Sequence, residues 1–192
     1  NRDQFDAMLD LLNVKFYINP DYRENSELIL LNKDHLPRVE MFYQAVILEN
    51  DEAVRRYMTS ESFDYRNQLV LTDSIGIDLP SSASTIPDHS VKIVRYDPNQ
   101  IEIDVQTNQD GLLWLSEIHY PAWKAWVDKK KTPIHIGDYS FRVIEVPAGQ
   151  HIVTLKYHSG FFQIGLWLCI LTIGISTFFL GTAFKTYKKS KF

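Results

Sequence analysis

The stretch "SEIHYPAWKAWVDKKKTPI", residues 116–134, places Tyr120, Trp123 and Trp126 around Pro121 and then runs into three consecutive lysines. A strand that enters a tight turn accounts for this pattern. A contact surface for a sugar, a lipid head group or another part of the same protein accounts for it as well. The strand interpretation fixes which side chains are available for such contacts.

Side chains of a strand alternate between its two faces. In "WKAWVD" one face is therefore Trp123, Ala125 and Val127, and the other is Lys124, Trp126 and Asp128. The first face is apolar and is predicted to be core, which makes Trp126 the exposed aromatic. Burial of both tryptophans between two layers is the alternative. The candidate contact surface consists of His119, Tyr120, Lys124, Trp126 and Asp128.

Short strands separated by turn signals surround this stretch. "IEIDVQT" alternates cleanly and predicts a half-buried strand, whereas "LLWLSEI" predicts a more deeply buried one. "DPNQ" predicts a turn, and "PAGQ", residues 147–150, is expected to close a hairpin. About seven such strands make a mainly β fold, a β-sandwich over residues 91–158, the leading architecture.

The first part of the chain has a mixed pattern. "DQFDAMLDLL" and "NDEAVRRYMTS" have helical spacing, the second with Asn50 as its cap, while "VKFYI", "ELILL", "RVEMFYQAVIL" and "QLVLT" predict strands. Residues 1–78 are therefore expected to form a small α+β lobe. The Ser- and Pro-rich residues 79–90 are expected to be a loop that divides it from the sandwich.

A long apolar run follows the strands. Residues 161–184 contain no charged side chain, and as a helix they extend roughly 36 Å, enough for a bilayer core of about 30 Å. Four lysines lie within residues 185–192. The positive-inside rule places this basic tail in the cytoplasm and residues 1–160 on the outside of the membrane, with the bilayer as a partner.

The charge and the motifs of the sequence restrict the classes of function to consider. Residues 1–160 carry 24 acidic and 16 basic residues, a net charge of −8, which argues against nucleic-acid binding. The six histidines are scattered, and no metal, P-loop or nucleophile motif is found. We assign no catalytic residue, metal or cofactor to this segment. Glu117 and Asp128 are a weak candidate for a carboxylate pair flanking a sugar.

Several motifs, taken in their order along the chain, resemble those of a known protein family. "SEIHYPAWKAWVDKKKTPI", "FRVIEVPAGQHIVTLKY" and the apolar run directly after them resemble the C-terminal end of the bacterial YfhO-type membrane proteins. The matching residues include Ser116-Glu117, Tyr120-Pro121, Trp123-Lys124-Ala125, Val127-Asp128, Phe141-Arg142, Val146–Gly149 and His151. Ala122 and Lys129 stand where that family usually has glycine. A positive φ at either position would be strained.

The resemblance implies a longer, multi-spanning parent protein, and the chain indeed begins at Asn1 without an initiator methionine. Such proteins are similar to the membrane-embedded (GT-C) glycosyltransferases that use polyprenyl-linked sugars, whose catalytic carboxylates lie in an early extracytoplasmic loop. Residues 1–160 are then expected to cover or support a transferase core that modifies cell-envelope glycans. Further transmembrane helices of the parent protein and a lipid-linked sugar or glycan would be its partners.

A cell-surface binding or structural module, tethered by a single C-terminal helix, is the alternative. The coding sequence upstream of Asn1 distinguishes the two hypotheses. About ten further hydrophobic spans would favour the transferase, and a signal peptide directly upstream would favour the tethered module.

Overall fold

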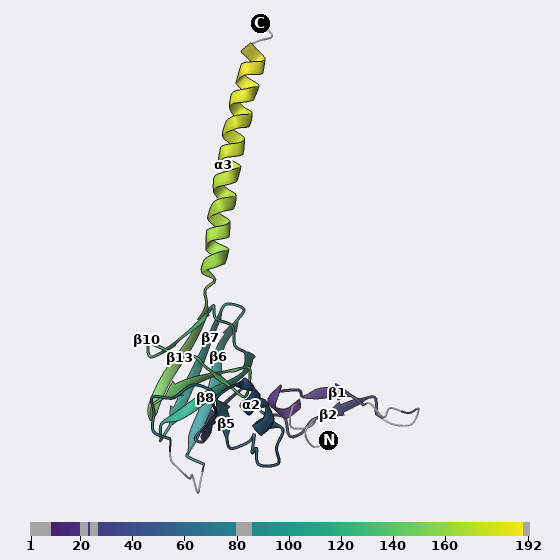
Figure 1. Ribbon diagram of the computed structural model, residues 1–192, viewed down its shortest axis with the longest axis vertical. Helices are drawn as coiled ribbons and strands as arrows, with labels where there is room; N and C mark the ends of the chain where they lie inside the picture. Colours follow the sequence, from purple (N-terminus) through teal and green to yellow (C-terminus); the bar gives the residue numbers. More distant parts are fainter. Residues whose placement is uncertain (1–8, 20–22, 24–26, 80–85, 190–192) are drawn as a thin grey trace. The chain divides into compact units, whose positions relative to one another are not determined.

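The chain forms two units, Asn1–Tyr157 and His158–Phe192, in a computed structural model that describes residues 9–19, 23, 27–79 and 86–189. Within the described residues, all β-strands lie in the first unit, and the second unit is one helix, α3 (Gly160–Lys189) (Figure 1).

Two sheets make up most of the first unit. The five-stranded sheet has the order β10-β9-β13-β7-β6 and consists of β6 (His89–Asp97), β7 (Gln100–Thr107), β9 (Trp123–Val127), β10 (Lys130–Thr132) and β13 (Gly149–Tyr157). The six-stranded sheet has the order β3-β8-β12-β11-β5-β4 and consists of β3 (Val39–Phe42), β4 (Ala45–Ile47), β5 (Leu69–Leu71), β8 (Gly111–Ile118), β11 (His135–Gly137) and β12 (Phe141–Val146). All neighbours are antiparallel except β4 and β5.

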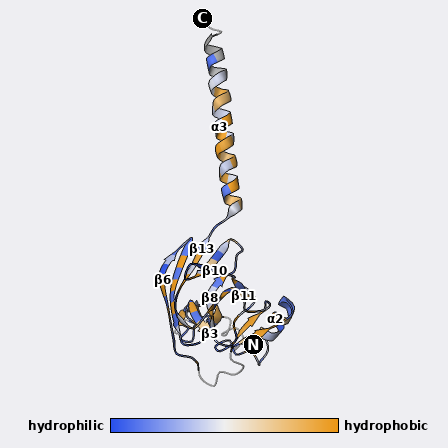
Figure 2. Ribbon diagram, turned by 90° about the vertical axis from the view of Figure 1, so that its left-hand side faces the viewer, coloured by the Kyte–Doolittle hydropathy of each residue, from blue (hydrophilic) through white to orange (hydrophobic). Residues whose placement is uncertain are grey.

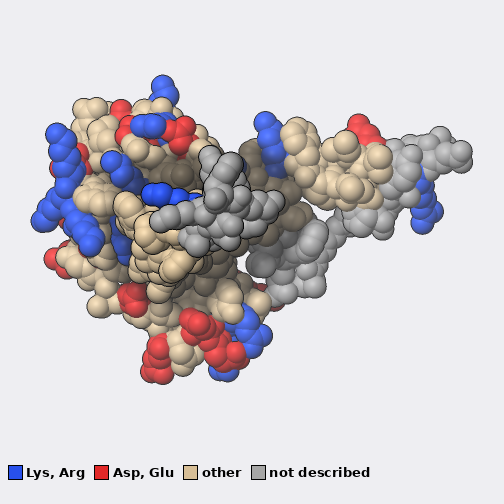
Figure 3. All heavy atoms as spheres, turned by 90° about the horizontal axis from the view of Figure 1, so that it is seen from above, with Lys and Arg blue, Asp and Glu red and all other residues tan. Residues whose placement is uncertain are grey.

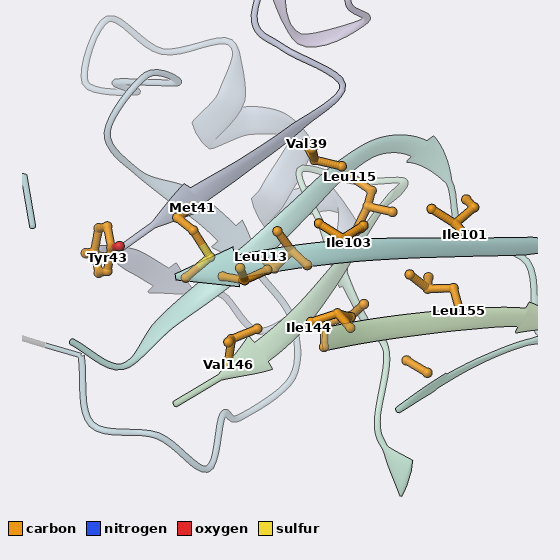
Figure 4. Packing of buried hydrophobic residues seen from close by; sticks show 13 residues of the cluster. Val39, Met41, Tyr43, Ile101, Ile103, Leu113, Leu115, Ile144, Val146 and Leu155 are labelled. Atoms are coloured by element: carbon orange, nitrogen blue, oxygen red, sulfur yellow. The ribbon is translucent and has the colours of Figure 1, made fainter. Parts of the chain in front are cut away.

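The facing sides of the two sheets enclose one hydrophobic core. Apolar side chains of β3, β8 and β12 meet those of β7, β9 and β13, as Figure 4 shows for Leu113, Ile144, Ile103 and Leu155. Each of these four is at most 2 % exposed. This arrangement confirms the predicted mainly β fold, and the even spacing of the buried side chains along β7 confirms that strand as half-buried.

The six-stranded sheet is covered on its second face as well. Phe42, Trp114 and Phe141 form a second apolar cluster there, in which Trp114 contacts both phenylalanine rings edge-on. Leu11, Leu36, Met58 and Phe63 complete this cluster from outside the sheet. Burial on both faces explains why "LLWLSEI" has no polar alternation in its first part.

The predicted α+β lobe of residues 1–78 is not a separate body. β3 pairs with β8 from Val39↔Leu115 to Phe42↔Leu112, and β5 pairs with β11, so the early strands belong to the same sandwich as the later ones. One unit therefore extends to Tyr157. The expected loop at residues 79–90 ends two residues earlier than predicted, because β6 already begins at His89; residues 80–85 lie outside the described part.

The predicted hairpin at "PAGQ" is wrong. β12 lies in the six-stranded sheet and β13 in the five-stranded one, so Pro147 and Ala148 carry the chain across the core from one layer to the other. Gly149 begins β13 with φ +133°, a region that L side chains rarely adopt. A turn signal marks a change of direction, but it does not reveal which sheet the next strand joins.

Smaller elements lie outside the two sheets. α2 (Asp51–Met58) begins as predicted, with Asn50 Oδ1 accepting from the Ala53 amide at 2.9 Å. β1 (Phe16–Ile18) and β2 (Ile29–Leu31) form a two-stranded ribbon. Residues 9–11 are helical, and the rest of the predicted N-terminal helix lies outside the described residues.

α3 has the properties predicted for residues 161–184. Its segment Gly160–Thr182 is long and apolar enough to cross a membrane, and none of that segment is buried inside the protein. Figure 2 shows hydrophobic residues along most of the helix, in contrast to the alternating colours of the strands. An apolar helix without a protein partner requires an apolar solvent, which a bilayer provides.

Candidate functional site

The residues of the opening stretch run from the end of β8 through a loop into β9 and β10. Glu117 is the next-to-last residue of β8 and the centre of a polar cluster. Its Oε2 lies 3.2 Å from Arg142 Nη1, and its Oε1 accepts from the Tyr96 hydroxyl. Arg38 Nη1 approaches the same Oε1 at 3.4 Å. Four residues from β8, β12, β6 and the segment before β3 thus meet at one carboxylate.

Arg142 occupies an enclosed position in this cluster. Only 4 % of the residue is exposed, its Nε donates to the Ile118 carbonyl, and its guanidinium carbon lies 4.2 Å from the centre of the Trp123 ring. The Nη1–Glu117 contact is a close ion pair without hydrogen-bond alignment. Burial lowers the pKa of Arg142, and the Glu117 charge opposes that shift, so the guanidinium stays cationic between a carboxylate and an aromatic face.

Aromatic rings extend the cluster towards the end of β13. Tyr157 contacts the Trp123 ring edge-on at 5.6 Å and stacks on Tyr120 at 6.1 Å. Tyr120 itself is 57 % exposed. His119 lies beside this stack with its pKa lowered by burial and by the charges of Arg142 and Lys124, which favours the neutral imidazole. This end of the sandwich therefore presents aromatic edges above a buried cation.

A second pair of side chains, Asp128 and His151, stabilises the turn between β9 and β10. His151 Nδ1 donates to Asp128 Oδ2, and the Ile152 amide donates to Asp128 Oδ1 at 2.9 Å. The hydrogen bond from His151, followed by that from Ile152, lowers the pKa of Asp128. Asp128 and Lys129 both have positive φ, as a two-residue hairpin turn with matching twist requires. The glycine expected at Lys129 thus had a conformational reason, whereas Ala122 is not among the described residues with positive φ.

The five candidate contact residues are distributed along β9 and its two ends. His119 and Tyr120 lie in the segment between β8 and β9, Lys124 and Trp126 lie on the outer face of β9, and Asp128 is in the turn at the other end of that strand. Lys124 Nζ donates to the Pro121 carbonyl at 3.0 Å. Their role in ligand contact remains a prediction.

The structure also locates the carboxylates suggested as a pair and one residue that the sequence interpretation missed. Glu117 binds Arg142 while Asp128 binds His151, so the two carboxylates do not act as a pair. Among the described residues, no group of three His, Cys, Asp or Glu is arranged to hold a metal ion. The sequence interpretation missed Arg142 as a cluster member, although its position within the Phe-Arg motif was a signal for it.

The two tryptophans of β9 are both half-buried. Trp123 packs against the core between the sheets, whereas Trp126 faces outward between Lys131 and Thr154 of the neighbouring strands. The predicted division of faces therefore holds, but Trp123 is less enclosed than a core tryptophan.

Replacing Trp123 by Ala should lower the free energy of unfolding by about 2 kcal/mol, roughly half the loss for a fully buried large aromatic. Trp126→Ala should lower it by about 1 kcal/mol or less, as for other outward-facing positions. Urea unfolding of the 192-residue chain in detergent micelles, followed by circular dichroism, measures both values. Equal losses at the two positions would contradict the division of faces.

One comparison with known proteins identifies a family. A family model described as "Bacterial membrane protein YfhO" matches residues 68–169, more than half of the chain. The match begins before β5 and ends inside α3, so it includes Tyr96, Glu117 and Arg142 of the cluster, the Asp128–His151 turn and the start of the apolar helix. The comparisons with curated proteins and with solved structures find no match. The chain belongs to the YfhO family of bacterial membrane proteins.

Proposed function

We propose that residues 1–157 form a non-catalytic extracytoplasmic domain of a multi-spanning, YfhO-like glycosyltransferase that uses polyprenyl-linked sugars in cell-envelope glycan modification. Membership of the family and the apolar helix α3 support attachment to a membrane. The domain would cover or support the transferase core, and the remaining transmembrane helices would be the partners of α3.

The carrying observation is that the family-motif side chains bind one another. Glu117 pairs with Arg142, Arg142 packs on Trp123, and Asp128 pairs with His151. A carboxylate that acts as an acid or base must reach its substrate, and these two are already bound by neighbouring side chains and, for Asp128, by a backbone amide. The motifs therefore support a structural role, with catalysis assigned to another part of the parent protein.

α3 supplies the expected contact with other helices. A Cβ added at Gly165, Gly174 or Gly181 would meet no atom within 4 Å, so these helix surfaces are open in the chain described. Small residues let transmembrane helices approach closely. We propose that they pack against helices of the parent protein.

The membrane orientation can be tested directly. Protease added outside intact cells, with any outer membrane permeabilised, should digest the β-sandwich but spare a tag placed after Phe192. The reason is the lysine asymmetry around the span, with four lysines in residues 185–192. Loss of the C-terminal tag to external protease would reverse the proposed orientation.

A sugar-transfer assay tests the proposal that catalysis lies in another part of the parent protein. The purified full-length parent protein, supplied with a lipid-linked sugar, should release product, and the 192-residue chain alone should not. Glu117→Gln in the full-length protein should retain turnover, provided that its thermal unfolding shows a folded domain. Turnover by the isolated chain, or loss of turnover in folded Glu117→Gln, would assign catalysis to this segment.

A further inference from the structure

Five lysines gather at one edge of the five-stranded sheet, four on the neighbouring strands β10, β9 and β13 and one in the turn between β9 and β10. We call them the lysine patch; its members are Lys124, Lys129, Lys130, Lys131 and Lys156. The register brings Lys124 opposite Lys156 and Lys131 opposite Trp126. In Figure 3, Lys and Arg side chains gather at the left of the molecule, on the side where Figure 1 draws β10.

The lysines of the patch are not engaged in ion pairs. In the part of the chain that the structure describes, no carboxylate forms an ion pair with any of the five lysines. Of the acids next to the patch, Asp128 is bound by His151 and the Ile152 amide, and Glu102 of β7, diagonal to Lys156, accepts from Gln100. At the other edge of the same sheet Arg95 pairs with Asp97, so paired charge is found on β6 but not on β9 and β10.

This local charge is opposite to that of the whole domain. Residues 1–160 carry a net charge of −8, yet the patch concentrates five positive charges on one sheet edge. Like charges held together repel one another, so the unpaired cluster is stabilised by an anionic partner. A large flexible polyanion would also meet the acidic remainder of the surface, whereas a planar anionic surface can contact the patch alone.

The chain connection brings such a surface within reach. Only His158 and Ser159 separate Tyr157, the end of β13, from the first residue of α3. An extended chain spans at most about 3.5 Å per residue, so Tyr157 stays within roughly 10 Å of the start of the helix whatever the orientation of the two units. Lys156 directly precedes Tyr157 on β13, and Lys124 lies opposite Lys156 on β9. At physiological salt, electrostatic attraction acts over about 8–10 Å.

Two aromatic side chains, the exposed Tyr120 and the half-buried Trp126, accompany the lysines. Tyr120 stacks on Tyr157 at this end of the sandwich, and Trp126 lies beside Lys131 on the outer face. Tyrosine and tryptophan favour the head-group level of a bilayer, because one end of the ring system is apolar and the other is polar. Lysines and aromatics together therefore match a lipid surface better than either would alone.

We propose that the lysine patch, with Tyr120 and Trp126, docks the β-sandwich onto the phosphate head groups of anionic lipids in the bilayer that holds α3. The contact would fix the orientation of the domain on the membrane. This inference depends on membrane attachment through α3 and not on the transferase activity, so the two proposals can fail separately.

Head-group quenching tests the docking. The full 192-residue chain, in a Cys169→Ala background, is labelled with a fluorophore at Pro133→Cys, next to β10, and reconstituted in nanodiscs that contain a nitroxide head-group lipid. In nanodiscs with about 30 % phosphatidylglycerol the label should be quenched at least two-fold more strongly than in phosphatidylcholine alone. Salt of about 0.5 M should remove the difference, since the screening length is then only a few ångströms.

Two triple variants, each losing three positive charges, distinguish an effect of the lysine patch from an effect of net charge. Lys130→Gln, Lys131→Gln and Lys156→Gln together should abolish the lipid dependence, while Lys15→Gln, Lys33→Gln and Lys92→Gln should preserve it; all six side chains are exposed. A label at Arg56→Cys on α2 should report no lipid dependence. Circular dichroism verifies that each variant is folded. Quenching that ignores anionic lipid, or that persists in the first triple variant, would overturn the proposal.

Discussion

Arg142→Ala should lower the free energy of unfolding by about 3–5 kcal/mol, the usual loss when one partner of a buried ion pair is removed. The substitution removes the nearer, buried cation of Glu117, whose side chain is 15 % exposed, and leaves only the partly exposed Arg38 at 3.4 Å. It also removes the cation above the Trp123 ring. The Ile118 carbonyl also loses its side-chain donor. Urea unfolding of the full chain in micelles, monitored by circular dichroism, gives the value.

Arg95→Ala is the matched control, because Arg95 also pairs with a carboxylate but is half exposed. It should lower the free energy of unfolding by about 1 kcal/mol or less. In the double variant Arg142→Ala, Glu117→Gln, part of the lost stability should return, since no carboxylate is then left without its nearer cation. A loss at Arg142 no larger than at Arg95, or no coupling in the double variant, would contradict the structural role of the cluster.

Asp138 should make the domain less stable as pH rises from about 4 to about 7. The side chain lies in the turn between β11 and β12, is 2 % exposed, and accepts from the Val70 amide of β5 at 2.9 Å. Burial raises the pKa of Asp138 from 3.8 to about 7, against a smaller opposing effect of that amide. Between these pH values the unfolded chain has released the proton and the folded chain retains it.

The folded state therefore binds more protons in this window, and the free energy of unfolding falls with rising pH, in total by roughly 4 kcal/mol for a shift of about three pKa units. Asp138→Asn removes the titration and keeps an oxygen that can accept from Val70. Asparagine also tolerates the positive φ of 47° at this position. The variant should match the wild type near pH 4 and exceed its stability near pH 7.5.

Unfolding of wild type and variant at several pH values tests this prediction, because the difference between them cancels the contributions of all groups that the two proteins share. A difference that does not change with pH would show that Asp138 ionises normally. Asp128 provides the contrast in sign: its pKa is lowered, chiefly by His151, so its contribution is lost as pH falls through that lowered pKa.

Local patterns in the sequence identified the features that depend on neighbours along the chain. Alternation in "IEIDVQT" gave the half-buried strand β7, Asn50 gave the start of α2, and the uncharged run gave α3. The ordered motifs pointed to the family that the match over residues 68–169 confirms. These signals survive in any fold, because strand and helix periodicity, capping and membrane length act within a few residues or a single element.

The assignment of strands to sheets required the three-dimensional structure. β3 pairs with β8 across more than seventy residues of sequence, and β12 and β13 are neighbours in sequence but belong to opposite layers. Alternation tells which face of a strand is apolar, but not which strand it pairs with. The predicted separate lobe and the predicted "PAGQ" hairpin were wrong for this one reason.

The same limit applies to the side chains of the motifs. Nothing local to Glu117 shows that its cation is Arg142, or that Asp128 would be held by His151. Such pairs form between residues brought together by strand register, and register is set by the burial of apolar faces over the whole sandwich. The residue types were readable from the sequence, whereas their partners followed from the packing of the two sheets.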